Sequence, residues 1–521
     1  MRVLSTILLL LIASTTFAQD WPLKKIVQDK KANSIAFTPI PAFSFVSNKT
    51  VGLKGTYQEL KLNATFSKQL LQQKPEAIQV TIPISSTKNI ICELVKFTLG
   101  NVIFTENDKD VIENIKVPVT YRGIIAGQSS KNNVMLTVNE DYLSFTATAD
   151  DRVLQITKAN EKATSAYRLY NSTQIDNPLP TLDCGTGSKA TPTASNIGID
   201  LSGATKPLGY LDKCVYVFVD CFDSMYIWRD TSTQKTINYV YELFNYVATG
   251  YLNEQISVQL TGINIWKPGD TTYRHASSAL GLADMSARWK DNFWGNICVG
   301  LDYGRGVGGR AGGIGTSKGV AANTCPAFDY SGSNKISACC YNDLNMSGGF
   351  VDFPHGPNTT QDQVDLVIHE IGHLLGAHHT QWCGWIISTG FPITFGALDN
   401  CFATEPVYVG DSPCAPGPPP PGGKGTIMSY CHLNSLISFN NGFGVQPGNA
   451  VRNYIDKNSC FPNCLVCTGI RYNPSSNNKH LFAWLPKETA SPHITAKVTP
   501  ASEDAVQTSN NANNILTNFK Q

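Results

Sequence analysis

Residues 369–379 read HEIGHLLGAHH, and this stretch decides the fold of the second half of the chain. It lies in a longer segment, TTQDQVDLVIHEIGHLLG, that is predicted to be one helix because its apolar residues recur at helical spacing. These apolar residues are Val364, Val367, Ile368, Ile371 and Leu375. Thr360 and Gln363 have the spacing of a capping box at the start of the helix. Gly376 is expected to end it, because glycine adopts the left-handed C′ conformation without strain.

Three histidines in this stretch have the spacing of metal ligands. His369 and His373 are four residues apart, so one helical turn places both imidazoles on the same side of the helix. The turn at Gly376 can bring His379 back as a third ligand. Three neutral histidines leave the fourth position of a zinc ion open for water, which is the arrangement of a catalytic site. We therefore predict that these histidines bind Zn²⁺.

Glu370 directly follows the first of these histidines and is positioned to contact a metal-bound water. Zinc lowers the pKa of such a water and polarises a carbonyl, and the glutamate takes the proton and later delivers it to the leaving amine. The predicted reaction is hydrolysis of an amide bond. A helix with incidental histidines is the alternative, and it explains the spacing poorly because the chain has only 9 histidines. His378 lies outside the ligand spacing and is expected to face solvent or to lie behind the ligands.

The same residues, together with Met428 in TIMSY, resemble the signature of the metzincin metallopeptidases, HExxHxxGxxH with a downstream Met-turn. Within that clan the chain is most similar to the secreted reprolysin (adamalysin-like) peptidases, which carry an N-terminal propeptide. The specific match covers about residues 369–460, and looser similarity extends back to about Cys214. The resemblance implies zinc binding by His369, His373 and His379, a general base at Glu370, and a hydrophobic floor beneath the metal at Met428.

Two departures separate the chain from typical adamalysins. Thr380 follows the third histidine, where adamalysins usually carry aspartate, and Cys431 follows the methionine instead of preceding it. The sequence from Met428 to Tyr430, MSY, is similar to astacins and serralysins, in which the tyrosine binds zinc or stabilises the oxyanion. Tyr430 is therefore a candidate catalytic residue, and the alternative is that it only packs.

The segment before the histidine helix alternates predicted strands with predicted helices, as in an α/β domain. The predicted strands are 214–221, 254–266 and 296–303, and the predicted helices are 232–251 and 277–291. We therefore predict an α/β (α+β) metzincin-type catalytic domain with a twisted, mostly parallel sheet. The glycine-rich residues 304–315 match no phosphate-binding motif and are expected to be flexible or closely packed backbone.

The first part of the chain has a different pattern. Residues from about 20 to 183 alternate polar and apolar side chains with period two, so this part is predicted to be rich in strands. Residues 185–198, GTGSKATPTASNIG, have the composition of a linker. With the resemblance above, we expect a β-rich propeptide with its linker at 19–198 and the catalytic domain at 199–462. Residues 463–521 are expected to be a short tail that could hold a small β unit followed by disorder.

Residues 1–18 are predicted to be a secretory signal peptide, because one arginine precedes an apolar run that ends in small residues. A retained anchor is the alternative, but the run is short for a membrane span. We therefore expect a secreted, extracellular protein without a membrane span after signal removal. Lys+Arg number 41 and Asp+Glu 40, without long blocks, which argues against nucleic acid and anionic membranes as partners. Protein or peptide substrates are expected, and the sequence does not predict an oligomeric state.

The 15 cysteines fit export, because disulfides persist in oxidising compartments. An odd number leaves at least one thiol without an intramolecular partner. Cys184, in LDCGTG, could be that thiol: in latent metzincins a propeptide Cys-Gly can occupy the fourth zinc position as a cysteine switch. An unpaired Cys92, or a disulfide at Cys184, would fit as well. Bridges among four further cysteines are expected to hold the loop beside the site: Cys383, Cys401, Cys414 and Cys431.

These features predict a secreted zinc endopeptidase that is made as a zymogen. A second possibility is a catalytically weak metzincin-like scaffold that acts as an extracellular binding or adhesion protein. The presence of Glu370 argues against this scaffold, because loss of the proton carrier would abolish turnover while zinc is kept. A third possibility is a zinc hydrolase that acts on a non-peptide amide.

Overall fold

The structure of the chain, a computed structural model, describes residues 21–464 with several gaps. The residues between these limits that are not described are 51–54, 150–151, 160–162, 176–212, 270–272, 274–275, 290–292, 319–337, 345–360, 389–391, 409 and 434–435. The predicted signal peptide, Cys184, the linker, Thr360 and the tail beyond residue 464 therefore lie outside the described residues.

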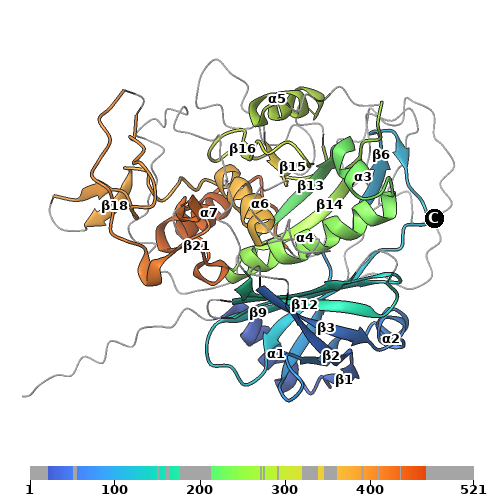
Figure 1. Cartoon of the computed structure of the whole chain (residues 1–521). Coiled ribbons are helices and arrows are strands. Elements are labelled where there is room, and N and C mark those ends of the chain that lie inside the picture. The colour runs from blue at the N-terminus through green and yellow to red at the C-terminus, as the bar shows by residue number, and fades with distance from the viewer. Residues whose placement is uncertain are drawn as a thin grey trace, which may run out of the picture. The chain divides into compact units, whose positions relative to one another are not determined.

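Ten strands between residues 38 and 175 form one sheet, so this part is rich in strands as the alternating pattern predicted (Figure 1). The strands are β1 (Thr38–Pro41), β2 (Phe43–Thr50), β3 (Gly55–Leu62), β4 (Ala77–Pro83), β5 (Asn89–Phe97), β8 (Val119–Ile125), β9 (Asn132–Asn139), β10 (Tyr142–Ala149), β11 (Arg152–Lys158) and β12 (Ala166–Ile175). Their order is β1-β4-β5-β8-β9-β10-β11-β12-β3-β2, and only β1 and β4 pair in parallel. Helices α1 (Pro22–Ala32) and α2 (Phe66–Gln73) contact this sheet.

A second sheet has seven strands. Five of them follow residue 213, and two come from the first part of the chain. It consists of β6 (Ile103–Glu106), β7 (Asp110–Val111), β13 (Cys214–Cys221), β14 (Ser257–Ile265), β15 (Ile297–Asp302), β16 (Gly309–Ala311) and β17 (Cys339–Asp343). The order is β16-β17-β15-β13-β14-β6-β7. The inner neighbours pair in parallel, and the edge strands β16 and β7 pair antiparallel.

Five helices accompany the second sheet, so the fold is mixed α/β. They are α3 (Asp223–Trp228), α4 (Thr233–Asn253), α5 (Ser278–Trp289), α6 (Gln361–Leu374) and α7 (Val445–Lys457). Helix α4 lies between the two sheets: it contacts β14 and α6 on one side and β8 and β9 on the other (Figure 1). One apolar core joins α4, α6 and the strands of the second sheet, and a separate core fills the first sheet.

The predicted elements from residue 214 to 303 are confirmed with small shifts at their ends. Strand β13 has the predicted bounds, and the ends of β14, β15, α4 and α5 lie within three residues of theirs. Helix α4 begins after Ser232, whose side chain accepts a hydrogen bond from the Lys235 amide, as an N-cap residue should.

The glycine-rich segment 304–315 contains a strand that its composition does not suggest. Residues Gly309–Ala311 form the edge strand β16, which pairs antiparallel with β17. A Cβ at Gly309 would lie 2.5 Å from the Glu370 carboxylate, so glycine is required where this strand passes the histidine helix. Of the two expectations, flexible or closely packed backbone, close packing is confirmed at Gly309, and the strand itself was not predicted.

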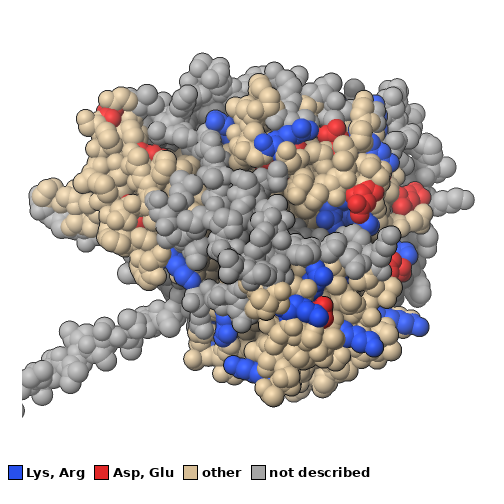
Figure 2. All heavy atoms as spheres, in the orientation of Figure 1, with Lys and Arg blue, Asp and Glu red and all other residues tan. Residues whose placement is uncertain are grey.

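No helix in the described part of the chain is long and apolar enough to cross a membrane. Figure 2 shows Lys and Arg side chains and Asp and Glu side chains as separate small areas on the visible face. This distribution agrees with the near balance of 41 basic and 40 acidic residues in the sequence.

Candidate metal centre

Helix α6 carries the first two histidines and is buried along the length whose side chains are described. Its predicted apolar residues Val364, Val367, Ile368 and Ile371 all lie in the core shared with α4. His369 and His373 are 6% and 0% exposed. The rigid packing of the helix thus fixes two imidazoles in a dry environment.

The helix ends as the sequence predicted. Gly376 has φ +98°, and its amide donates to the His373 carbonyl at 2.9 Å while the Ala377 amide donates to the Gly372 carbonyl at 2.9 Å. These two bonds form a Schellman motif, which stops the helix and turns the chain. The turn returns His379 to the other two histidines.

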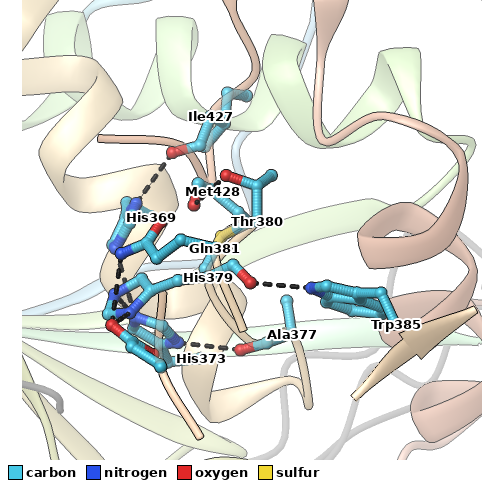
Figure 3. Close-up of polar contacts among 10 residues, drawn as sticks. His369, His373, Ala377, His379, Thr380, Gln381, Trp385, Ile427 and Met428 are labelled. Carbon is cyan, nitrogen blue, oxygen red and sulfur yellow. Dashed lines mark hydrogen bonds and ion pairs between the residues drawn. The ribbon is translucent and has the colours of Figure 1, made fainter. Parts of the chain in front are cut away.

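The three imidazoles converge through their Nε2 atoms (Figure 3). His373 Nε2 lies 3.1 Å from His369 Nε2 and 3.0 Å from His379 Nε2. His369 Nδ1 donates to the Ile427 carbonyl at 2.7 Å, and His373 Nδ1 donates to the Ala377 carbonyl at 2.8 Å. A carbonyl can only accept, so Nδ1 carries the proton and the Nε2 lone pairs of these neutral rings face the common centre.

Burial keeps these rings neutral. It lowers the pKa of His369 to about 4 and the pKa of His373 well below its usual value, and the neighbouring His379 lowers both further. Converging lone pairs on neutral imidazoles repel one another unless a cation lies between them. Three nitrogen donors are also a donor set that zinc prefers, so these residues fit a zinc ion.

The third histidine is held by a carboxylate that the sequence analysis missed. Glu405 Oε1 accepts from His379 Nδ1 at 2.7 Å and from Gln381 Nε2 at 3.1 Å. The His379 carbonyl accepts from Trp385 Nε1 at 2.7 Å, which fixes the backbone of the ligand as well (Figure 3). Carboxylates commonly orient metal-binding histidines in this way. No spacing in the sequence points to Glu405, because the contact depends on how the loop after residue 383 folds back.

Met428 lies against the histidine helix, where the Met-turn prediction places it. It is fully buried, and its carbonyl accepts a hydrogen bond from the Thr380 amide at 3.0 Å. A Cβ at Gly372 would lie 2.9 Å from the Met428 sulfur and 2.6 Å from the Phe443 ring. The glycine inside HEIGH is thus needed for the methionine to pack this closely. Thr380, at the position of the usual aspartate, also donates its hydroxyl to the Met428 carbonyl at 3.5 Å, and its own carbonyl accepts from the Leu398 amide at 2.7 Å.

The two other residues with predicted catalytic roles also lie beside the histidines. Glu370 is fully buried on α6 and faces strand β16 at Gly309. The Tyr430 ring is 6% exposed, and its centroid lies 4.7 Å from that of His379 and 6.2 Å from that of His369. Glu370 thus lies against β16, and the Tyr430 ring lies next to the His379 ring.

His378, which was expected to face solvent or to lie behind the ligands, is half-buried against two tryptophan rings. Its ring stacks on Trp382 with centroids 3.8 Å apart, and Trp385 meets it edge-on at 6.3 Å. Burial lowers the pKa of His378 to about 3. This ring therefore packs behind the ligand loop.

The cysteines beside the centre form the expected bridges. Cys383 is bonded to Cys414, and Cys401 to Cys431, so the long loop after the third histidine is tied at two places. The Cys401–Cys431 bond also accounts for a second cluster of metal-binding residue types around Asp399, because its sulfurs are already bonded.

Several described cysteines carry free thiols. Five described cysteines are not in disulfides, and all are buried: Cys92, Cys221, Cys298, Cys339 and Cys340. Burial raises the pKa of the Cys92 thiol. The odd cysteine count therefore does not single out Cys184 as the free thiol, and Cys184 lies outside the described residues.

The mixed α/β fold and a buried three-histidine cluster beside a glutamate define a zinc metalloendopeptidase of the metzincin class. Residues 213–435 match the model of metallo-peptidase family M12, Reprolysin_5, so this segment is similar to reprolysin-like metallopeptidases. No curated protein sequence matches the chain significantly.

Two solved structures show limited similarity to the chain. Metalloproteinase-II from Bacteroides fragilis has 12% sequence identity and a TM-score of 0.34, and the match covers 60% of this chain and 85% of that one. A chaperone–substrate complex has 9% identity and a TM-score of 0.22, with 58% and 40% covered. At these TM-scores neither structure carries an argument about this chain.

Proposed function

We propose that the chain is a secreted zinc-dependent endopeptidase that is made as a zymogen and hydrolyses peptide bonds of proteins. The convergence of three histidine ring nitrogens within 4.8 Å of one another, with Glu370 directly after the first histidine on α6, carries this proposal. The M12 family match over residues 213–435 supports it independently.

In this mechanism His369, His373 and His379 would hold the metal, and their Nδ1 partners keep them aligned. A bound zinc ion would supply Lewis-acid activation of water and of the scissile carbonyl. Glu370 takes a proton from the attacking water at its carboxylate and delivers it to the leaving amine nitrogen. The burial of Glu370 excludes bulk water from this transfer.

Two neighbouring features complete the proposed site. The edge strand β16 passes Glu370 at Gly309, so a substrate chain bound along this edge would present its backbone to the carboxylate. Tyr430 beside His379 is proposed to stabilise the oxyanion or to bind zinc, and Met428 to form the floor beneath the metal. The second sheet is assigned as the twisted, mostly parallel sheet of a metzincin-type domain.

The zymogen part of the proposal concerns the first half of the chain. We assign residues 1–18 as the signal peptide, 19–198 as the propeptide with its linker, 199–462 as the catalytic domain and 463–521 as the tail. Cys184 is proposed as the latch that fills the fourth zinc position. Three described disulfides are typical of an oxidising compartment and support export.

The experiment is cleavage of an unfolded protein substrate by wild type and Glu370→Ala after removal of the latch segment, each with and without a chelator. Both proteins should bind about one zinc, only the wild type should cut, and the chelator should stop it. The exposed Glu113→Ala is the matched control and should cut like wild type. Zinc-loaded wild type that cuts no member of a broad peptide library would instead favour the binding-scaffold alternative.

A further inference from the structure

Residues 99–116 leave the first sheet between β5 and β8 and join the second one (Figure 1). Strand β6 pairs in parallel with β14, from Ile103 opposite Gly262 to Glu106 opposite Ile265. Strand β7 then closes this extension as an antiparallel edge. We call residues 99–116 the clasp, because they supply two strands to a sheet that otherwise starts at residue 214.

The clasp contributes apolar side chains to the core of the second sheet. Leu99 and Phe104 are 2% and 7% exposed and belong to the same core as α4 and α6. Val102, Ile112 and Ile115 pack against that core from its border. Separation of the clasp would expose these side chains and leave the edge of β14 unpaired.

Charged groups add to the clasp contact. Glu106 receives the Lys267 ammonium at 2.5 Å and the Thr233 hydroxyl at 2.6 Å. Asp108 pairs with Arg288 at 3.0 Å. These partners lie on different elements of the second half of the chain, so the clasp is fixed from several sides.

The clasp is also connected to a buried carboxylate. Asn264 Oδ1 accepts from the Thr105 hydroxyl at 2.9 Å and from the Asp108 amide at 2.8 Å. The same Asn264 donates to Asp220 at 2.9 Å, and Asp220 further accepts from Trp266 at 2.9 Å. The hydrogen-bond chain therefore runs from the clasp into the interior of the second sheet.

Outside the clasp the two halves meet through apolar side chains and through a polar face of α4. Met135 of β9 belongs to the core of the second sheet, and Leu252 of α4 belongs to one apolar cluster with Trp21 and Leu23. Asn238, Glu242 and Asn245 occupy one face of α4, and each hydrogen-bonds a buried side chain of the first sheet. The pairs are Asn139–Asn238 at 2.9 Å, Ser144–Glu242 at 2.6 Å and Arg122–Asn245 at 2.8 Å. Water could replace most of these bonds on separation, so this face alone would hold the halves weakly.

The contact between the halves is also noncovalent among the described residues. Every disulfide with both partners described joins two cysteines within residues 214–464. In the described part of the first half the cysteine is Cys92, which is buried and not disulfide-bonded.

We propose that residues 21–175 stay bound to the peptidase domain after the chain between them is cut, and that the clasp holds them. This inference rests on the proposed zymogen. Activation then removes the latch segment, which contains Cys184, and leaves the first sheet bound. The active enzyme is then a noncovalent complex of two polypeptides, with α4 permanently covered.

The test uses the Glu370→Ala chain, so that self-cleavage plays no part, with a site-specific protease sequence placed within residues 176–183. This position precedes Cys184, so the N-terminal fragment carries only Cys92 and the fragments share no disulfide. After the cut, size-exclusion chromatography at low micromolar concentration and in 0.5 M salt should give one peak with both fragments. Two separate peaks of folded fragments would overturn the proposal.

A second variant tests the clasp itself. Replacement of residues 101–113 by a short Gly-Ser loop should weaken fragment association by roughly 100-fold or more, because buried apolar side chains and a strand pairing are lost. Ser144→Ala should weaken it less than about tenfold, because one exchangeable hydrogen bond is lost. Val117→Ser, at a side chain that is 46% exposed beside the clasp, is the control and should have no effect.

If circular dichroism shows that the uncut loop variant is unfolded, the double variant Phe104→Ala, Ile112→Ala is tested in its place. Fragment association that is as tight without the clasp as with it would contradict the assigned role of the clasp. These outcomes are independent of the proposed peptidase activity, because the chain tested is catalytically disabled and only association is measured.

Discussion

At the scale of single residues, the third histidine depends on a partner far away in sequence. Glu405 accepts the His379 Nδ1 proton at 2.7 Å and is itself anchored through backbone bonds to Gln381 and Cys383. In typical adamalysins an aspartate follows the third histidine, and this chain has Thr380 there. The loop tied by two disulfides thus places a carboxylate behind the ligand.

Glu405→Ala should lower zinc affinity by about 10- to 100-fold, because His379 loses the partner that fixes its tautomer and orientation. Glu405→Gln keeps an acceptor and should lose less. The measurement is competition with a chromophoric chelator, read without any substrate, and the exposed Glu113→Ala is the control. An unchanged affinity for Glu405→Ala would show that His379 needs no such support.

The histidines and Glu370 could be predicted because their spacing along one helix and one turn is local. Glu405 could not, because its approach to His379 follows from loop folding across a sequence separation of 26 residues. The stacking of His378 on Trp382 was missed for a similar reason: adjacent positions in a turn have no periodicity that fixes which way a ring points.

At the scale of elements, the end of α6 determines where the third ligand lies. Gly376→Ala should lower the free energy of unfolding by about 1–2 kcal/mol, because φ +98° strains a residue with a Cβ and the new methyl meets Tyr454 at 3.2 Å. Zinc affinity should fall as well, since the turn carries His379. Chemical denaturation and chelator competition measure the two effects.

Gly410 provides the matched control for this change. Its φ is +97°, but a Cβ there would meet nothing within 4 Å. Gly410→Ala should therefore cause only the strain effect, about 1 kcal/mol, with zinc affinity unchanged. Equal losses of zinc affinity in both variants would contradict a specific role for the turn at Gly376.

Local periodicity was enough for the elements from residue 214 to 303, where short strands and longer helices differ clearly in pattern. It was not enough for residues 103–111, which read as strands of the first half: β6 pairs with β14, and β7 pairs with β6. Strand partners are set by long-range packing, which a period of two does not encode. The polar face of α4 is another example, because Asn238 and Glu242 resemble a solvated face yet are 6% and 7% exposed.

At the scale of the whole molecule, the joint between the two sheets contains a carboxylate that should respond to pH. Burial raises the pKa of Asp108 to about 6, because its effect is larger than the lowering of the pKa by the nearby Arg288. Between about pH 4 and 6 the folded chain therefore binds more protons at this group than the unfolded chain. Its contribution to the free energy of unfolding falls as the pH rises through this window.

Asp108→Asn removes this titration and keeps a similar shape. Relative to wild type, the free energy of unfolding of the variant should rise from pH 4 to pH 7. The rise should be about 1 kcal/mol, because solvent screening reduces the effect. Urea titrations at several pH values measure it. A constant difference across this range would mean that Asp108 has an ordinary pKa in the folded protein.

The central claim is that one zinc ion lies between three histidines with Glu370 beside it, and crystals of zinc-loaded protein measured at the zinc absorption edge test it most directly. We predict a single anomalous peak about 2.1 Å from the Nε2 atoms of His369, His373 and His379, with Glu370 not coordinated. An empty centre in zinc-supplied crystals, or a peak with Glu370 as a ligand, would contradict the account.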